Sequence, residues 1–224
     1  MVSPTPEPRR RPGAEETRRR LIAAGLRAFA AHGLEGTNLR EDILEKAGVS
    51  VGSFYHQFPD KTGLLLAILD EYGTRSRERL HALHAPRPGR SAVDVARDSF
   101  AFVLEMAERE EDLVRIQLRV RSSDDARVQT FERESRERWR ASLAEDYRRI
   151  SAAGGVAIEA ELLADLMIGL SLGVVAQYLE TPPAGRRAAR ERLLDGLVRF
   201  TLGGAASFLQ PNAPVSTHPA DTQE

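Results

Sequence analysis

Residues 48–58 read Gly48-Val49-Ser50-Val51-Gly52-Ser53-Phe54-Tyr55-His56-Gln57-Phe58, and they follow a short amphipathic stretch from Leu39 to Ala47. A turn of small residues that leads into a compact aromatic helix is typical of a helix-turn-helix, whose second helix enters the major groove of DNA. The stretch therefore predicts a small helical domain at the N-terminal end, and it favours gene regulation over catalysis.

The same residues contain a competing motif. Gly48 to Gly52 matches G-x-S-x-G, the nucleophile elbow of α/β-hydrolases, which requires a buried strand before the serine. The preceding segment, 39–47, is charged and rich in helix formers, and it is not a β-branched run. No acidic residue stands in a motif that indicates general acid–base chemistry either. We therefore predict no catalytic residues and no enzyme.

Composition limits the remaining classes. At 224 residues the chain can hold one or two domains, and it has no cysteine. Disulfides, thiolate zinc sites and cysteine nucleophiles are excluded on that ground. The formal net charge is −1, yet residues 1–30 carry seven Arg and three Glu. A basic end on a nearly neutral chain suits nucleic-acid contact confined to one region.

No targeting or membrane-spanning segment is expected. The prolines and arginines near the N-terminus are not followed by the apolar region of a signal peptide. The most apolar stretch, Leu166 to Ala176, has about half of the ~20 residues that a membrane span requires. The prediction is a soluble, cytoplasmic protein without a membrane partner.

Hydrophobic periodicity predicts about nine helices and no strands, an all-α fold. Asn38 is the expected N-cap of the second helix with Glu41 completing a capping box, Ser50 caps the third, and Gly33 and Gly48 end the first two. The expected limits are 14–32, 38–47, 50–57, 60–83, 91–109, 111–121, 124–152, 159–179 and 186–209.

The order of small and aromatic residues resembles a known family. His32-Gly33-Leu34-Glu35-Gly36-Thr37, then Ile43-x-x-x-Ala47-Gly48-Val49-Ser50-x-Gly52-x-Phe54-Tyr55-x-x-Phe58-x-x-Lys61, is similar to the DNA-binding domain of TetR-family transcriptional regulators. The resemblance covers about residues 15–70. It implies a three-helix helix-turn-helix domain and a helical ligand-binding and dimerisation domain. The predicted division is a disordered basic arm at 1–13, the DNA-binding domain at 14–60, the ligand-binding domain at 61–209 and a disordered tail at 210–224.

The resemblance also implies a function. Members bind a palindromic DNA operator as homodimers, and most are repressors that a small-molecule effector releases. The family's DNA-contacting positions fall on Thr37, Asn38, Arg40, Val51, Ser53, Tyr55, His56, Gln57 and Lys61. Of these, Val51 and Ser53 match positions that face base edges, while Tyr55 and Lys61 match positions that contact the DNA backbone.

Two departures from the family pattern affect these assignments. The segment between Thr37 and Ile43 is one residue longer than the family norm, so the roles of Asn38 and Arg40 shift by up to one position. Val51 stands where many members have lysine; it cannot bind phosphate, but it can pack on a thymine methyl group. Gln57 could pair with adenine from the same face as Ser53, four residues earlier.

Structural alternatives stand beside several of these roles. The hydrophobic core of the DNA-binding domain, called the head below, is interpreted as containing Ile43, Ala47, Phe54 and Phe58. Tyr55 could be a half-buried aromatic residue instead of a phosphate contact. The arginines at 9–11 and 18–20 could contact phosphates or the minor groove, or they could be solvated charge.

The body offers a candidate dimer interface. Gly169, Ser171 and Gly173 place small residues on the apolar stretch, and the last helix is rich in leucine, valine and phenylalanine. Together they suit an isologous interface of four helices, so we expect a homodimer through the last two helices. The alternative is that both helices fill the core of one protomer.

Side chains for an effector pocket can be suggested from the same region. The candidates are Phe102, Met106, Gln117, Trp139, Met167 and Tyr178. Aromatic residues at helical spacing are more often core than ligand contacts, but Trp139 and Tyr178 carry polar tips that need partners when buried. Arg115 and Arg119 could meet an anionic ligand or pair with nearby carboxylates.

No metal or other cofactor is predicted. His81 and His84 are spaced for one turn of a helix, but a solvated face is the expected reading because no third ligand is evident.

Two other functions stay open at this point. One is a helical small-molecule-binding protein or enzyme with a vestigial DNA-binding head. The other is an architectural or activating DNA-binding protein that no metabolite releases.

Overall fold

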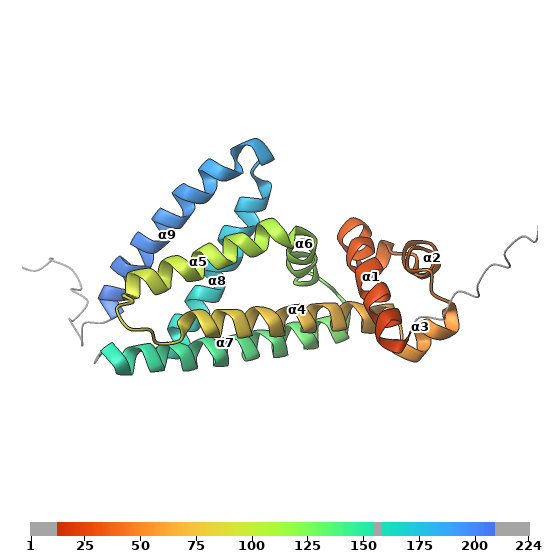
Figure 1. Cartoon of the computed structure of the whole chain (residues 1–224), viewed down its shortest axis with the longest axis horizontal. Helices are drawn as coiled ribbons and strands as arrows, with labels where there is room; N and C mark the ends of the chain where they lie inside the picture. The colour runs from red at the N-terminus through yellow and green to blue at the C-terminus, as the bar shows by residue number, and fades with distance from the viewer. Residues whose placement is uncertain (1–12, 155–157, 209–224) are drawn as a thin grey trace, which may run out of the picture. The chain divides into compact units, whose positions relative to one another are not determined.

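The computed structural model describes residues 13–154 and 158–208, and over these residues the regular structure is helical, with no strands (Figure 1). The all-α prediction is confirmed. The elements are α1 (Ala14–Gly36), the π-helix η1 (Leu39–Leu44), α2 (Glu45–Ala47), α3 (Val51–Gln57), α4 (Lys61–His84), α5 (Ala92–Arg109), α6 (Glu111–Val120), α7 (Ala126–Gly154), α8 (Ala160–Glu180), the 3-10 turn η2 (Pro183–Gly185) and α9 (Arg186–Phe208).

The predicted disordered arm, apart from Gly13, and the predicted tail lie outside the described residues, as do Arg9, Arg10 and Arg11. The described residues form two compact units. The first contains residues 13–79 and 106–138, and the second contains residues 80–105, 139–154 and 158–208. Helices α4, α5 and α7 contribute to both units. The functional division at residue 60 stays a prediction.

The helix caps show how the sequence sets the start of each short helix. The Asn38 side chain accepts hydrogen bonds from the backbone N–H groups of Arg40 (2.9 Å) and Glu41 (3.2 Å), which confirms it as an N-cap. The reciprocal bond comes from Asp42, whose carboxylate accepts from the Asn38 N–H at 2.8 Å. Asp42 thus replaces Glu41 as the partner in the capping box.

The end of α1 differs from its prediction. Gly33 was expected to stop the helix, but the helical turns continue to Gly36 across a break at Gly33, where φ is 70° and ψ is −179°. A left-handed φ of this kind favours glycine because a Cβ atom would clash with the backbone. The break turns the chain toward the helix-turn-helix instead of ending the helix.

A π-helix spans the segment between Thr37 and Ile43, where the family resemblance implies one extra residue. Within η1 the N–H of Glu45 donates to the carbonyl oxygen of Arg40, five residues earlier. A π-turn takes one more residue than an α-turn, which suits a longer segment at this place. Ile43 and Leu44 are both buried.

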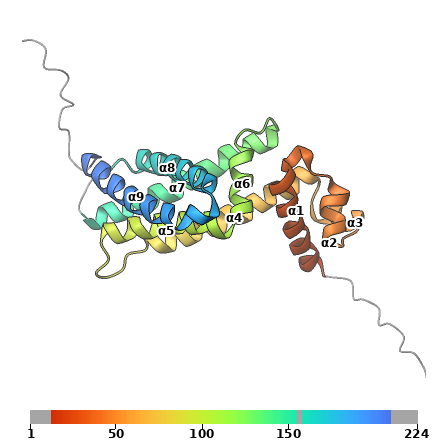
Figure 2. The same ribbon diagram turned by 90° about the horizontal axis from the view of Figure 1, so that it is seen from above.

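Helices α1, α2 and α3 gather around the first turns of α4, all within the first unit (Figures 1 and 2). Gly48 adopts the left-handed conformation (φ 63°, ψ 40°) and joins α2 to α3, as predicted. The core of this head is apolar and almost fully buried: it includes Leu21, Phe29, Ile43, Ala47, Phe54, Phe58, Leu64, Leu65 and Ile68. The predicted core residues of the head are confirmed.

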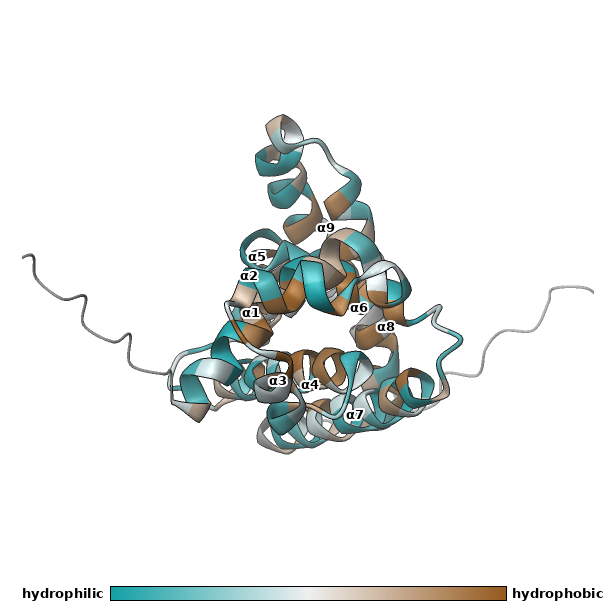
Figure 3. Ribbon diagram, turned by 90° about the vertical axis from the view of Figure 1, so that its right-hand side faces the viewer, coloured by the Kyte–Doolittle hydropathy of each residue, from teal (hydrophilic) through white to brown (hydrophobic). Residues whose placement is uncertain are grey.

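In the second unit, α9 turns back after η2 and contacts α8. Parts of the α8 ribbon are coloured as apolar in Figure 3. By length and composition alone, this 21-residue helix could cross a membrane, and 22% of its most apolar window is buried within the protein. The apolar segment is therefore longer than the 11 residues estimated from sequence, and Leu162 and Leu166 are exposed on it.

Candidate nucleic-acid interface

Helix α3 is anchored to the head by two aromatic side chains. Phe54 has 0% of its surface exposed and Phe58 has 3%, and their ring centroids lie 6.0 Å apart. The Arg18 guanidinium lies 4.9 Å from the centroid of the Phe58 ring and pairs with Glu71 on α4. These contacts fix the direction in which α3 presents its remaining side chains.

The other side chains of α3 face outward. Val51 is 53% exposed and Tyr55 is 56% exposed, and His56 is exposed as well. The Tyr55 ring packs edge-on against Phe54, with centroids 5.2 Å apart, so the ring is held on one side and open on the other. A short helix that buries aromatic side chains on one face and exposes the opposite face has the arrangement needed to enter a groove of DNA.

Two of the predicted base-reading residues have partners inside the head. The Ser53 hydroxyl lies 2.9 Å from the Ser50 hydroxyl, and the Ser53 N–H donates to the same Ser50 oxygen at 3.2 Å, which confirms Ser50 as the cap of α3. The side-chain amide of Gln57 donates to the carbonyl oxygen of Ala14 at 3.3 Å. This links the end of α3 to the start of α1.

The residues before α2 differ in exposure. Thr37 is buried, and its hydroxyl donates to the carbonyl oxygen of Gly33 at 2.5 Å. The Asn38 amide oxygen is occupied by the cap of η1. Arg40 keeps its guanidinium largely in solvent, with Nε 3.6 Å from the Glu45 carboxylate. Of the three, Arg40 presents an exposed cation.

Lys61 lies at the first position of α4, and its ammonium group turns toward the chain that leads from α1 to η1. It donates to the carbonyl oxygen of Thr37 at 2.8 Å and lies 3.4 Å from that of Glu35. The ammonium therefore neutralises the carbonyl dipoles at the end of α1.

Sequence reasoning missed two contacts that tie other helices to the head. The Arg119 guanidinium on α6 donates to the carbonyl oxygen of Ala30 at 2.6 Å, near the break in α1, while Arg115 pairs with Glu111 at 2.6 Å. The Arg127 guanidinium on α7 lies 2.7 Å from the Asp60 carboxylate, and this contact lowers the pKa of Asp60.

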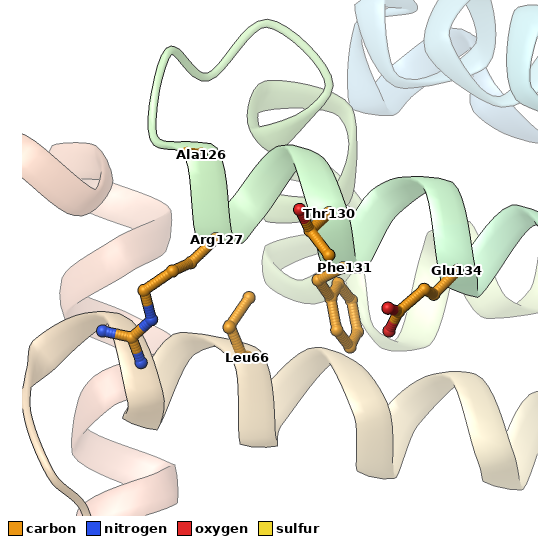
Figure 4. A pocket seen from close by; sticks show the side chains of 6 residues that line it. All are labelled: Leu66, Ala126, Arg127, Thr130, Phe131 and Glu134. Carbon is orange, nitrogen blue, oxygen red and sulfur yellow. The ribbon is translucent and has the colours of Figure 1, made fainter.

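A shallow groove of about 460 Å³ lies between α4 and α7 in the first unit. Figure 4 shows Leu66 of α4 and Phe131 of α7 facing each other across it, with Arg127 directed toward the start of α4. The lining is completed by Ala126, Thr130 and Glu134. The groove is wide open to solvent, and none of the six predicted effector-binding residues lines it.

Those six residues are divided between the units. Met106 and Gln117 belong to the first unit, and the second contains Phe102, Trp139, Met167 and Tyr178. Phe102, Met106 and Tyr178 are buried, and the other three are partly buried. The Tyr178 hydroxyl donates to the carbonyl oxygen of Arg186 at 3.4 Å, so its polar tip has a partner within the protein.

The solvated face expected for His81 and His84 is wrong for His84, which is 3% exposed. Its Nδ1 lies 2.8 Å from one oxygen of the buried Asp146, and its Nε2 lies 2.9 Å from the Ser99 hydroxyl. The half-exposed His81 lies 2.7 Å from the other Asp146 oxygen, and Arg149 pairs with the same carboxylate. Among the described residues there is no group of three side chains arranged to hold a metal ion.

This cluster predicts a dependence of stability on pH. Burial acts to raise the pKa of Asp146, but the hydrogen bond from His84 and the attraction of His84, His81 and Arg149 outweigh it and lower that pKa. A carboxylate with a lowered pKa in the folded state stabilises the fold above its unfolded pKa of about 4 and loses that contribution as the pH falls through the folded pKa.

Asp146→Asn is therefore expected to lower the free energy of unfolding at pH 7 by about 2 kcal/mol. The difference from the wild type should shrink as the pH falls below about 4. Urea unfolding at pH 7, 4 and 3 measures both effects. Asp98→Asn, which removes an exposed partner of Arg90, serves as the control and should change little at any pH. Equal stability of Asp146→Asn and the wild type at pH 7 would contradict the role of the cluster.

The second unit exposes an apolar stripe on its last two helices. On α8, Leu162 and Leu166 are 42% and 47% exposed, and on α9 Phe200 is 68% exposed. Glycines continue the stripe, since a Cβ atom at each would meet open space: they are Gly169, Gly173, Gly196 and Gly203. Among the apolar residues of the last helix, the side chains of Leu202 and Phe208 lie outside the described part of the chain.

Comparison with known proteins identifies the head. The family model described as bacterial regulatory proteins, tetR family, matches residues 21–68. The chain is 39% identical over 90 residues to the HTH-type transcriptional regulator BetI of Burkholderia thailandensis, which covers 38% of this chain and 46% of that protein. It is 46% identical over 57 residues to the regulator TtgR of Pseudomonas putida, covering 25% of this chain and 27% of that one. The matched part is thus less than half the length of these relatives.

Solved structures extend the likeness in fold to most of the chain. GusR of Salmonella enterica superposes with a TM-score of 0.69 at 22% identity, covering 84% of this chain and 94% of that one. The fatty acid degradation regulator FadR of Bacillus halodurans gives a TM-score of 0.71 at 16% identity, covering 84% and 95%. At these identities the agreement concerns the fold.

Proposed function

Because the chain belongs to the TetR family of transcriptional regulators, we propose that it binds a palindromic DNA operator as a homodimer and that a small-molecule effector releases it. Repression is the proposed outcome of such binding. The observation that carries this proposal is the orientation of α3. The buried side chains of Phe54 and Phe58 hold the helix in the head, while those of Val51 and Tyr55 are more than half exposed on its open side.

The candidate residues of the head divide into those proposed to contact DNA and those proposed to hold the helices and the turn before η1 in position. We assign phosphate contacts to Tyr55, His56 and Arg40, whose side chains are exposed. Thr37 and Lys61 act by positioning, because each is hydrogen-bonded to the turn between α1 and η1. Asn38, Ser53 and Gln57 cap or join helices in the free protein, and any contact with DNA would be in addition to that.

Lys61→Met tests this division. It is expected to weaken operator binding because the turn before η1 loses its support, while the slope of log affinity against log salt changes by much less than one. A lysine that neutralises a phosphate would reduce that slope by about one. Fluorescence anisotropy from 50 to 300 mM salt gives the slope. Lys61→Arg keeps the charge and the donors and should retain binding; a slope lowered by a full unit in Lys61→Met would make Lys61 a phosphate contact.

The homodimer is assigned to the apolar stripe of α8 and α9. Glycine in the exposed interior of a helix costs about 1 kcal/mol relative to alanine, and four of them on one stripe suit a surface that another helix approaches closely. Exposed leucine and phenylalanine beside them supply the apolar area that such an interface buries. A second copy of the chain is the partner proposed, through an isologous contact.

The effector is proposed to be a small molecule bound by the helical body, and the protein is proposed to act in the cytoplasm, where DNA is accessible. The candidate contacts stay those predicted from sequence: Phe102, Met106, Gln117, Trp139, Met167 and Tyr178.

Selection from a pool of random DNA duplexes tests the proposal. The purified protein is expected to enrich one motif with two-fold symmetry, whose half-sites are centred about one helical turn apart or a multiple of that. Enrichment that shows no motif, or a motif without symmetry, would overturn the dimeric operator-binding function.

A further inference from the structure

The exposed side chains of α3 fall on two flanks of the helix. Ser53 and Gln57 lie four residues apart and share one flank, whereas Val51 and Tyr55, also four apart, share the other. Gly52 and His56 lie between the two flanks. The two flanks differ in chemistry, and this difference bears on how the helix reads a base sequence.

The polar flank is hydrogen-bonded within the head. The Ser53 hydroxyl is paired with that of Ser50 at 2.9 Å, and the Gln57 amide donates to the Ala14 carbonyl oxygen at 3.3 Å. A serine hydroxyl and a glutamine amide can each form more than one hydrogen bond, so a contact with a base would add to these bonds. The internal bonds restrict how both side chains can orient toward a base.

The other flank begins with an aliphatic side chain. Val51 is the first residue of α3 and is 53% exposed, and its side chain has no polar atom. Residues at the N-terminal end of a recognition helix are those that meet base edges in the major groove. Next to it, a Cβ atom at Gly52 would meet nothing within 4 Å, so the backbone at this end of α3 is open to close approach.

Only one base offers an apolar group in the major groove. Thymine carries a C5 methyl group there, while the edges of adenine, guanine and cytosine present hydrogen-bond donors and acceptors. An exposed aliphatic side chain that replaces water around a methyl group gains free energy without any hydrogen bond.

We propose that Val51 is a specificity-determining residue of this protein and that it selects thymine in each half-site through contact with the C5 methyl group. This inference rests on the proposed function and adds to it the base that is read and the group that reads it. Tyr55 then fixes register from the same flank by contacting the backbone.

The test removes a single methyl group. An operator motif is obtained by selection with the wild-type protein, and each thymine of a half-site is replaced in turn by deoxyuridine, which pairs identically but has no C5 methyl group. At one thymine per half-site, the replacement is expected to weaken wild-type binding about fourfold, and about fifteenfold when both half-sites are changed. The other thymines of the motif serve as internal controls.

Two variants link the effect to Val51. Val51→Ala should fold normally because the side chain is exposed and alanine favours a helix. It should bind the thymine and deoxyuridine operators equally. Val51→Thr keeps one methyl group with nearly the same shape and should retain most of the discrimination.

The possible results separate this inference from the function on which it rests. If no symmetric motif is enriched, the proposed function itself fails. If a motif is enriched but no deoxyuridine replacement affects the wild type, or if Val51→Ala keeps the full effect, Val51 does not read thymine and this inference is overturned. A loss of discrimination confined to Val51→Ala supports it.

Discussion

Replacing Phe54 with alanine is expected to lower the free energy of unfolding of the head by about 4 kcal/mol, because a fully buried phenyl ring is lost and a cavity remains. Phe54 lies on α3, packs against Phe58 and supports Tyr55 edge-on. Without the Phe54 ring, α3 loses the buried side chain that packs it against the rest of the head. Operator binding should therefore disappear together with the stability of the head. Thermal unfolding followed by circular dichroism, and anisotropy with the selected operator, measure the two effects.

Tyr55→Ala is the matched control for this prediction. It removes an aromatic ring from the neighbouring position of the same helix, but a ring that is more than half exposed. Its effect on unfolding should stay within about 1 kcal/mol, while operator binding is weakened. A Phe54→Ala protein that unfolds like the wild type and binds normally would show that α3 is not held as described.

Leu166→Asp is expected to raise the dissociation constant of the dimer by at least about a thousandfold. In an isologous interface each substitution occurs twice, so two carboxylates would be taken out of water without partners. Leu166 is 47% exposed in the single chain, and the aspartate can stay solvated in the monomer, which should remain folded. Sedimentation velocity over a range of concentrations measures the change. Operator binding should fall with it, because two linked heads are needed to occupy two half-sites.

Val93→Asp provides the comparison. Val93 on α5 is 45% exposed, close to the value for Leu166, but it lies outside α8 and α9. The same change of charge there should leave the dimer intact. An equal rise in the dimer dissociation constant of both variants would mean that net charge or folding causes the change. An unchanged dissociation constant in Leu166→Asp would place the interface elsewhere.

The local features of the head could be read from the sequence because each depends on residues that are close in the chain. Asn38 and Ser50 cap the helices that they precede, and Gly48 supplies the left-handed turn between α2 and α3. The end of α3 at Gln57 was predicted, and its start at Val51 is one residue later than the expected limit because Ser50 is the N-cap. The family resemblance also implied an extra residue before Ile43, but the π-helix found there, in which Ile43 and Leu44 are buried, depends on packing that the local sequence does not show.

Contacts between distant residues could not be predicted in this way. Arg119 meets the carbonyl oxygen of Ala30 across 89 positions, Arg127 meets Asp60 across 67, and His84 meets Asp146 across 62. Charged residues are numerous in this chain, and their spacing in sequence does not indicate which pairs meet. For that reason His84 was assigned to a solvated face although it is buried against Asp146.

The candidate site also combines local features that the sequence predicts with contacts between distant residues that it does not predict. The family pattern predicted candidate residues for the interface, but not that Lys61, Ser53 and Gln57 have hydrogen-bond partners within the head. Those bonds require the fold of the chain between Ala14 and Lys61. They are the reason for assigning base reading to Val51 and support to Lys61.

Hydroxyl-radical footprinting on the DNA upstream of the protein's own coding sequence tests the account most directly. We expect protection of two segments that are related by a dyad and lie about one helical turn, or a multiple of it, apart. This protection should weaken steeply with salt and be lost in Leu166→Asp. Protection of one uninterrupted segment without a dyad, or a symmetric footprint that Leu166→Asp leaves unchanged, would contradict the claim that paired copies of α3 carry the recognition.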